Sequence, residues 1–285
     1  MTTAPRQLVG RDCSLLLNRP RIMGVLNVTP DSFSDGGCYI TPERALRQGL
    51  ALQSEGADLL DIGGESTRPG AAVVSVAEEL SRVVPVIELL RQHTDLPISI
   101  DTSKAAVARE AMAAGANFIN DISGLTFEPA IAAVAAETGA GLFLMHTRGR
   151  PTEMQQDTGY GDLLADVVAG LRLSVALARA AGISQDRLAV DPGIGFGKSV
   201  AGCLELLQQL DRLHQLGCPI LLGTSRKSFI GKLLQREDPR QRLAGTLATV
   251  ALAVARGVQL FRVHDVRSAR DAALVAWAIC ERQLP

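Results

Sequence analysis

The segment Pro97-Ile-Ser-Ile-Asp-Thr-Ser-Lys104 has a pattern that recurs along the whole chain. Ile98 and Ile100 are β-branched residues typical of a buried parallel strand, and the apolar run stops at Asp101. The hydroxyls of the next two residues can cap a helix, which we expect to begin near Lys104. A carboxylate at the C-terminal tip of a buried strand lies at the rim of the core, where it faces any bound ligand.

Seven more apolar runs along the chain end in the same way, at a polar residue or a glycine. They are Ile22–Asn27, Asp58–Ile62, Phe118–Asp121, Gly141–His146, Leu188–Asp191, Ile220–Gly223 and Gln259–His264. Each gap between consecutive runs has room for a helix, which is the crossover that parallel strands need. The chain therefore reads as α/β, and we predict one domain over residues 1–285, a single (β/α)8 TIM barrel. An open, doubly wound sheet is the alternative, but it would need a topological switch point and usually has fewer strands.

Turn residues and capping signals divide the rest of the chain. Residues 1–20 are an N-terminal extension in which we expect a strand or hairpin that closes the bottom of the fold. Thr41 followed by Pro42 predicts a helix start, as does the capping box Ser75–Glu78. Further helices are expected over about residues 103–114, 128–138, 160–181, 200–216, 240–256 and 268–282. Long loops are expected over residues 27–37, 63–70 and 146–160.

The composition excludes several classes of protein. With 285 residues, a formal net charge of −1 and a pI near 6.4, the chain has no general attraction for nucleic acid or an anionic membrane. Its five cysteines form no C-x-x-C pair and its four histidines are far apart, so neither a disulfide framework nor a zinc site is indicated. No apolar run suits a secretory signal or a membrane span. We expect a cytoplasmic protein with reduced thiols.

Polar residues at the strand ends should converge, because the active site of a TIM barrel lies at that end. They are Asn27, Asp61, Asp101, Asn120, Asp121, His146, Asp191, Arg262 and His264. Asp101, Asn120 and Asp191 together suit a flat heterocycle with amine and ring N–H edges, because carboxylates accept hydrogen bonds and an amide both donates and accepts. Taken singly, Asp101 could instead cap its helix and Asn120 could bond to the backbone.

Cationic and hydroxyl residues follow the last two predicted strands. Gly223–Ser228 puts two cations and three hydroxyls at a helix start, which suits an anionic or electron-rich ligand. Arg262 and His264 alternate on the last strand and so point to the same side, where TIM barrels often hold phosphate. The alternative for Arg262 is a structural ion pair with Asp265 or Asp271.

The glycine-rich segment Asp191–Ser199 is not a nucleotide-binding loop. Pro192 stands where the first glycine of a P-loop must be, and the third glycine comes one residue early for G-x-G-x-x-G. We expect these glycines to adopt positive φ or to let the backbone approach a ligand. Magnesium remains compatible with the chain, because it needs few protein ligands.

Seven motifs in this order resemble the dihydropteroate synthase family, from about Met23 to Val266. They are Met23–Gly37, Asp61–Gly70, Asp101–Lys104, Asn120–Ile122, Asp191–Lys198, Ser225–Ser228 and Arg262–Asp265. Any one of them alone would mean little, but several long motifs in one order are highly specific. The resemblance implies a TIM barrel that joins 6-hydroxymethyl-7,8-dihydropterin diphosphate to p-aminobenzoate, with Mg²⁺ as cofactor. It also implies a homodimer formed through barrel helices, such as the apolar helix expected near residues 243–254.

The resemblance also implies a role for each motif residue. The residues that would hold the pterin are Asp101, Asn120, Asp191 and Lys227. Those that would contact the diphosphate are Thr67, Arg68, Arg262 and His264, and Mg²⁺ would bind Asn27. The aminobenzoate pocket would be formed by Phe33, Pro69, Phe196, Lys227 and Ser228. The catalytic residues would be Asp101, Lys227, Arg262 and His264.

The implied chemistry needs no nucleophile from the protein, which agrees with the sequence motifs found. Loss of diphosphate from an activated CH₂ group would leave a cation delocalised into the pterin, which an aromatic amine can attack without a protein nucleophile. An associative displacement would use the same residues and stays open as an alternative. Loops 28–38 and 63–72 would close over the site and exclude water. Two rivals stay open, a corrinoid-linked methyltetrahydrofolate methyltransferase and a pterin-binding paralogue without catalysis. The first has no use for groups that bind a diphosphate.

Overall fold

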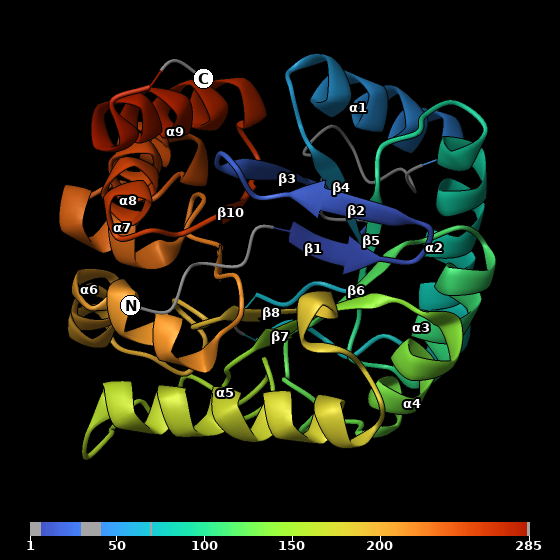
Figure 1. Ribbon diagram of the computed structural model, residues 1–285, viewed down its shortest axis with the longest axis horizontal. Coiled ribbons are helices and arrows are strands. Elements are labelled where there is room, and N and C mark those ends of the chain that lie inside the picture. The colour runs from blue at the N-terminus through green and yellow to red at the C-terminus, as the bar shows by residue number, and fades with distance from the viewer. Residues whose placement is uncertain (1–6, 30–40, 69, 284–285) are drawn as a thin grey trace.

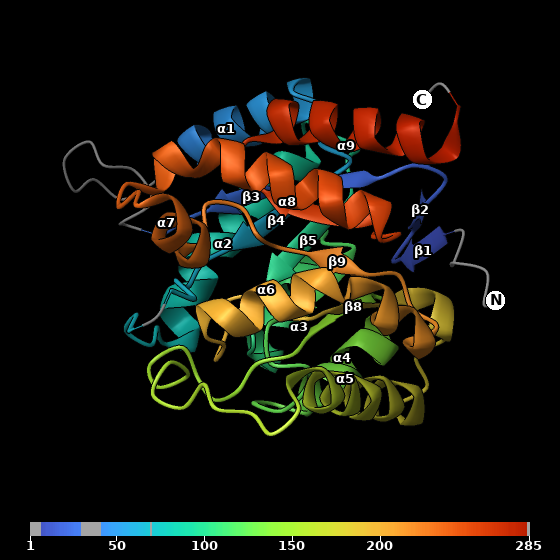
Figure 2. The same ribbon diagram turned by 90° about the vertical axis from the view of Figure 1, so that its left-hand side faces the viewer.

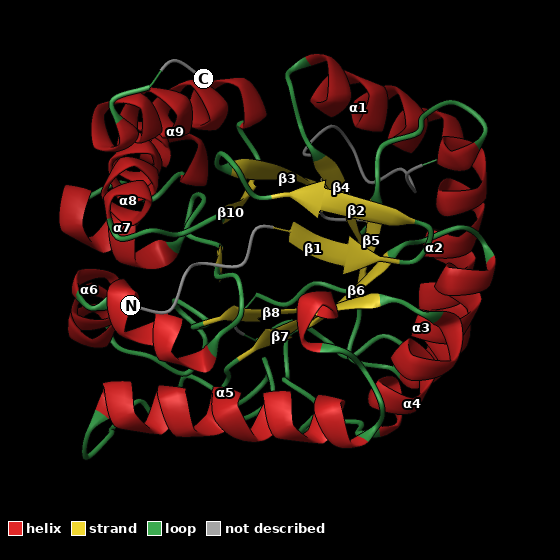
Figure 3. Ribbon diagram, viewed as in Figure 1, coloured by secondary structure: helices red, strands yellow, loops and turns green. Residues whose placement is uncertain are grey.

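A computed structural model describes residues 7–29, 41–68 and 70–283, in which eight parallel strands form a barrel inside a ring of helices (Figures 1 and 3). The strands are β3 (Arg21–Asn27), β4 (Leu59–Gly63), β5 (Ile98–Asp101), β6 (Phe118–Asp121), β7 (Gly141–Met145), β8 (Leu188–Asp191), β9 (Leu221–Leu222) and β10 (Leu260–Val263). Their order is β8-β7-β6-β5-β4-β3-β10-β9, and a parallel bridge between Val190 and Ile220 joins the two outer strands. The predicted barrel is confirmed, and the open sheet is excluded.

Helices alternate with the strands and cover the outside of the barrel (Figure 3). They are α1 (Pro42–Ser54), α2 (Val76–Arg91), α3 (Ala105–Ala113), α4 (Ala130–Thr138), α5 (Leu163–Ala180), α6 (Val200–Gln208), α7 (Ser228–Leu234), α8 (Leu243–Ala255) and α9 (Val266–Glu281). Short 3₁₀ turns add η2 (Gln185–Arg187), η3 (Leu210–Leu216) and η4 (Pro239–Arg242). The helix expected over 200–216 is thus α6 followed by η3, and the one expected over 240–256 is η4 followed by α8. No helix among the described residues is long and apolar enough to cross a membrane.

All three helix starts predicted from capping residues are confirmed, but only two of the caps are. The side chains of Thr41 and Ser75 accept hydrogen bonds from backbone N–H groups in the first turns of α1 and α2. The hydroxyl cap predicted for α3 is wrong, because its N-cap is Lys104 and no side chain caps it. Thr102 Oγ1 accepts instead from the N–H of Lys104, 3.2 Å away. This hydroxyl shapes the turn between Asp101 and the helix.

An antiparallel hairpin of β1 (Gln7–Gly10) and β2 (Cys13–Leu16) closes the end of the barrel at which the strands begin (Figures 1 and 2). Leu8 packs there in one apolar cluster with Phe118 and Phe143 from the barrel strands. Glycine permits this contact, since a Cβ at Gly141 would lie 2.7 Å from the carbonyl oxygen of Val9. The predicted plug is confirmed, so the carboxyl ends of the strands are the end left for ligands.

Candidate active site

Arg262 lies at the centre of a polar cluster formed by side chains from β4, β5, β6 and β10. Its Nε donates to Asp61 Oδ2 at 2.6 Å and its Nη2 donates to Asp101 Oδ2 at 2.7 Å. Asn120 Nδ2 donates to the same oxygen of Asp61, at 3.1 Å. One guanidinium is thus shared between two buried carboxylates. The alternative ion pair with Asp265 or Asp271 is excluded, because the ion pairs of Arg262 are with Asp61 and Asp101. Asp265 pairs instead with Arg226, through two hydrogen bonds of 2.9 and 2.5 Å.

The register of the parallel strands places the polar residues of β5 and β6 at the same height along the barrel axis. Asp101 at the end of β5 pairs with Gly63 on β4 and with Asn120 on β6. A Cβ at Gly63 would lie 3.7 Å from Asp101 Oδ2 and 3.5 Å from Asn27 Oδ1. The missing side chain at this position therefore leaves a space open between Asn27 and Asp101.

The cluster has hydrogen-bonding capacity that the protein itself does not use. Oδ1 of Asp61 and Oδ1 of Asp101 are buried and have no partner among the described residues. Burial raises the pKa of Asp101 to about 7, although the charge of Arg262 acts in the opposite direction. A buried acceptor without a donor costs about 1–3 kcal/mol. A ligand that brings N–H donors would remove this cost.

Asp191 and Lys227 face the same space from β8 and from the start of α7. Asp191 Oδ1 accepts from the N–H of Gly193 at 2.7 Å. A Cβ at Gly223 would lie 3.9 Å from Asp191 Oδ2, 3.8 Å from Lys227 Nζ and 3.8 Å from Arg262 Cβ. Burial raises the pKa of Asp191 and lowers that of Lys227 to about 8, against the attraction between the two. Gly223 thus leaves room among three charged side chains.

An aromatic ring lies beside Lys227 on the glycine loop that follows β8. Lys227 Nζ lies 4.8 Å from the centre of the Phe196 ring, within the range of a cation–π contact. It also donates to the carbonyl of Ile194. Ser228, the first residue of α7, is exposed next to it. This side of the site therefore combines an aromatic face, a cation and a hydroxyl.

Ser225 contacts His264 at two atoms. Ser225 Oγ accepts from the backbone N–H of His264 at 3.1 Å and lies 3.0 Å from its Nδ1. In the tautomer in which the hydroxyl donates to Nδ1, the neutral ring carries its proton on Nε2. Burial, followed by the charge of Arg262, lowers the pKa of His264 to about 3. Nε2 has no hydrogen-bond partner among the described residues.

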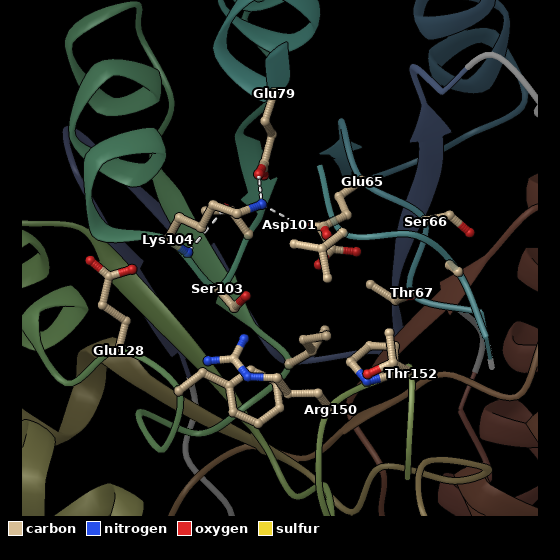
Figure 4. Close-up of a pocket in the computed structure, with 16 residues that line it drawn as sticks. Glu65, Ser66, Thr67, Glu79, Asp101, Ser103, Lys104, Glu128, Arg150 and Thr152 are labelled. Atoms are coloured by element: carbon tan, nitrogen blue, oxygen red, sulfur yellow. Dashed lines mark hydrogen bonds and ion pairs between the residues drawn. The ribbon is translucent and has the colours of Figure 1, made fainter. Parts of the chain in front are cut away.

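A cavity of about 90 Å³ adjoins the cluster, under the loop that follows β4 (Figure 4). Asp101 and Thr67 both line it, so it is continuous with the site. On its far side Lys104 pairs with Glu65 and, at 2.5 Å, with Glu79. Arg68 on the same loop is exposed, and its charge reaches His264. The cavity thus extends from the carboxylate cluster to hydroxyl and cationic side chains.

Most residues expected from the sequence gather here, but two rim residues do not contribute to the open space. Asp121 closes its own turn, accepting hydrogen bonds from Ser123 and from the N–H of Leu125. His146 is turned toward Lys198. Phe33 and Pro69 lie outside the described residues.

Asp61 is the residue whose importance sequence reasoning missed. We placed it at the rim without a role, yet it binds both Arg262 and Asn120. The available signal was its position on β4, two residues before Gly63, which is level with Asp101. Alternate residues of a strand point to the same side, so Asp61 extends the polar surface into the barrel.

A metal ion would find few ligands in the protein itself. No group of three or more His, Cys, Asp or Glu side chains among the described residues is placed to hold one. Asn27 at the end of β3 offers a single neutral oxygen next to the open space at Gly63. Such a site fits only a hard cation that takes its other oxygens from water and a ligand, as Mg²⁺ does.

Comparison with known proteins gives consistent matches. Residues 23–264 match the family described as pterin binding enzyme. The dihydropteroate synthase of a Synechocystis species is 50% identical over 261 residues, which are 92% of this chain and 90% of that protein. The Yersinia pestis dihydropteroate synthase, solved in complex with a sulfonamide drug, is 47% identical with a TM-score of 0.92, over 96% of this chain and 99% of the other. The Xanthomonas albilineans enzyme with 4-aminobenzoic acid is 49% identical with a TM-score of 0.90, over 99% and 100%.

The raised pKa of Asp101 predicts a pH-dependent stability that this one carboxyl controls. An unfolded aspartate titrates near 3.9, so between about pH 4 and 7 the folded chain keeps a proton that the unfolded chain has released. Stability from this group therefore falls as the pH rises through that window. The side chain of Asp101→Asn cannot titrate. The difference between the free energies of unfolding of the variant and of wild type should therefore rise, in favour of the variant, by on the order of 2 kcal/mol from pH 4.5 to pH 7.5.

Denaturant titrations of both proteins across this pH range make the comparison. Asp186→Asn is the matched control, because Asp186 is exposed. Its profile should run parallel to wild type. A parallel profile for Asp101→Asn would contradict the assignment.

Proposed function

The chain belongs to the pterin-binding enzyme family and, within it, to the dihydropteroate synthases, which are transferases, and we propose the following reaction for it. It joins 6-hydroxymethyl-7,8-dihydropterin diphosphate to p-aminobenzoate and releases 7,8-dihydropteroate and pyrophosphate. We propose that this step belongs to folate biosynthesis, as the name of the family implies.

The observation that carries the proposal is Oδ1 of Asp101, a buried acceptor without a partner among the described residues. The amine and ring N–H edge of a pterin supplies the donors that this oxygen lacks. Asn120 on the next strand can donate to and accept from the same ring. Asp191 and Lys227 would meet the other edge, across the room left by Gly223.

The side chains beside the proposed pterin site offer hydrogen-bond donors that could bind the diphosphate. Arg262 uses Nε and Nη2 for the two aspartates, and its Nη1 has no hydrogen-bond partner among the described residues. His264 presents Nε2–H from the same strand end, and Thr67 and Arg68 lie on the adjoining loop. Fixed donors of this kind stabilise negative charge as it develops on a leaving oxygen.

The p-aminobenzoate would lie on the side of Lys227 and Phe196. An aromatic face suits the benzoate ring, and Ser228 at the first turn of α7 suits its carboxylate. Phe33 and Pro69 complete the proposed pocket, although they lie outside the described residues. The relative solved with 4-aminobenzoic acid supports a pocket for this substrate.

The proposed reaction breaks the bond between the methylene carbon and the diphosphate oxygen before the new bond forms. The electron pair leaves with the oxygen, toward Arg262 and His264. The positive charge spreads into the pterin, where the carboxylate of Asp101 stabilises it. The amine nitrogen of p-aminobenzoate then bonds to the methylene carbon and loses a proton. Mg²⁺ held at Asn27 would offset negative charge on the diphosphate.

Both rival functions make different use of the same site. A methyltetrahydrofolate methyltransferase would need the pterin groups but not the free donors of Arg262 and His264. A paralogue without catalysis would bind a pterin and turn nothing over. Product formation therefore separates the three.

We predict metal-dependent turnover that depends on Asp101. Purified protein with dihydropterin diphosphate, p-aminobenzoate and Mg²⁺ should release dihydropteroate and pyrophosphate in equal amounts. Asp101→Asn should lower kcat/KM by at least about a hundredfold, because it removes the charge that stabilises the developing cation. Chromatography of dihydropteroate and a coupled pyrophosphate assay measure the two products.

Asp186→Asn and an EDTA-treated sample are the controls for this assay. The first should match wild type, since Asp186 is exposed away from the cluster, and the second should be inactive. Pterin binding without either product would refute the synthase and favour the paralogue. Methyl transfer from methyltetrahydrofolate would favour the other rival.

A homodimer is the assembly that we propose, formed by the outer faces of α8 and α9. These helices pack side by side on the outside of the barrel (Figure 2). Leu252 on α8 is 69% exposed, and Ile279 on α9 is 72% exposed. No charged residue lies within α8. A second copy would cover this apolar surface.

Leu252→Asp should weaken such a dimer at least about a hundredfold, because an unpaired charge would be buried at the contact. Light scattering at micromolar concentration should then report twice the chain mass for wild type and a single chain for the variant. Leu173→Asp on α5 is the matched control, since Leu173 is 58% exposed on another helix. A dimer that survives Leu252→Asp, or a monomeric wild type, would contradict this interface.

A further inference from the structure

Lys198, at the end of the glycine loop, is a buried cation that the proposed reaction does not use. Its side chain is 4% exposed. Nζ lies 2.9 Å from the carbonyl of Phe196, 3.0 Å from His146 Nδ1 and 3.2 Å from the carbonyl of His146. Burial lowers the pKa of Lys198 to about 7. In the ammonium form its three protons match these three acceptors, so Lys198 has no donor left for a ligand.

His146 is held as a neutral acceptor for this lysine. Burial, followed by the charge of Lys198, lowers the pKa of His146 to about 3. Gly170 on α5 leaves space for the imidazole ring, because a Cβ at this position would lie only 2.8 Å from His146 Cδ2. Gly193 in the loop after β8 lies so close to His146 that a Cβ there would overlap the carbonyl oxygen of His146. The pair therefore joins the end of β7 to the loop after β8.

The glycine loop is held by a row of side-chain donors. Four consecutive carbonyls, those of residues 194–197, each accept a hydrogen bond from a different side chain. The donors are, in order, Lys227, Gln155, Lys198 and Tyr160. Lys198 is the most deeply buried of them, and it binds the carbonyl of Phe196 itself. The position of the Phe196 ring therefore depends on Lys198 more directly than on the others.

We propose that Lys198 is a positioning residue for the aminobenzoate pocket, tying the carbonyl of Phe196 to His146 so that the ring stays beside Lys227. This inference rests on the proposed function, in which Phe196 forms one wall of that pocket. Two of the groups proposed for the pterin, on β5 and β6, have partners outside the glycine loop, Arg262 and Asp61. A third, Asp191, is held by the N–H of Gly193 and not by Lys198. Loss of Lys198 should thus weaken the binding of p-aminobenzoate more than the binding of the pterin.

The test is a steady-state comparison of Lys198→Met with wild type, with each substrate varied in turn. Methionine keeps the unbranched shape of the side chain, one atom shorter, and removes its three donors. The KM for p-aminobenzoate should rise about tenfold or more, because hydrogen bonds from a buried charge are lost. The KM for dihydropterin diphosphate should change less than about threefold. Lys232→Met on α7 is the matched control, since Lys232 is exposed, and it should behave as wild type.

A second pair of variants decides the matter if Lys198→Met does not fold, as judged by circular dichroism. His146→Asn keeps an acceptor near the position of Nδ1 and should retain the wild-type KM for p-aminobenzoate. His146→Leu removes that acceptor and should raise this KM as Lys198→Met does.

Three results would overturn the inference. They are an unchanged KM for p-aminobenzoate in Lys198→Met, an equal rise for both substrates, and the same behaviour in both His146 variants. Wild-type protein without turnover would refute the proposed function as well, whereas an active wild type with any of these results refutes the positioning role alone.

Discussion

The site depends on one guanidinium shared by two buried carboxylates. Arg262 holds Asp61 and Asp101 together at the mouth of the barrel, and Asn120 joins them through Asp61. Removing one partner from a buried ion pair typically costs about 3–5 kcal/mol, so the cluster is strongly constrained. It is also incomplete, because an oxygen of Asp101 and Nη1 of Arg262 have no partner among the described residues. A ligand with donors on one side and negative charge on the other would complete it.

The two ends of the barrel have different roles: one end is packed with apolar side chains and the other holds the polar site. At one end the N-terminal hairpin packs Leu8 against Phe118, and the cluster is apolar throughout. At the other end Gly63 and Gly223 leave space beside the charged side chains of the cluster. The same barrel is thus filled by apolar side chains at one end and leaves room for a flat ligand at the other.

Much of this arrangement could be predicted from the sequence. The end of an apolar run locates the end of a strand, so Asp101, Asn120 and Asp191 were placed at the barrel mouth correctly. Side-chain partners could not be predicted in the same way. Arg262 and Asp61 are 201 residues apart, and only the closed barrel brings them together.

The errors have a local physical cause. A carboxylate at a strand end can face the ligand or close its own turn, and the choice depends on which N–H groups the next residues present. Asp121 closes its turn because the chain folds back over it, with Leu125 at a φ of 69°. Thr102 bonds to the N–H of Lys104 and so shapes a turn that we had read as a helix cap.

A crystal structure of the protein with 6-hydroxymethylpterin would show directly whether Asp101 binds the pterin. We expect the ring to enter the barrel mouth with its amine and N–H edge on Oδ1 of Asp101 and within hydrogen-bond distance of Asn120 and Asp191. A pterin bound elsewhere, for example in the cavity beside Lys104, with Oδ1 of Asp101 still unpaired, would contradict it.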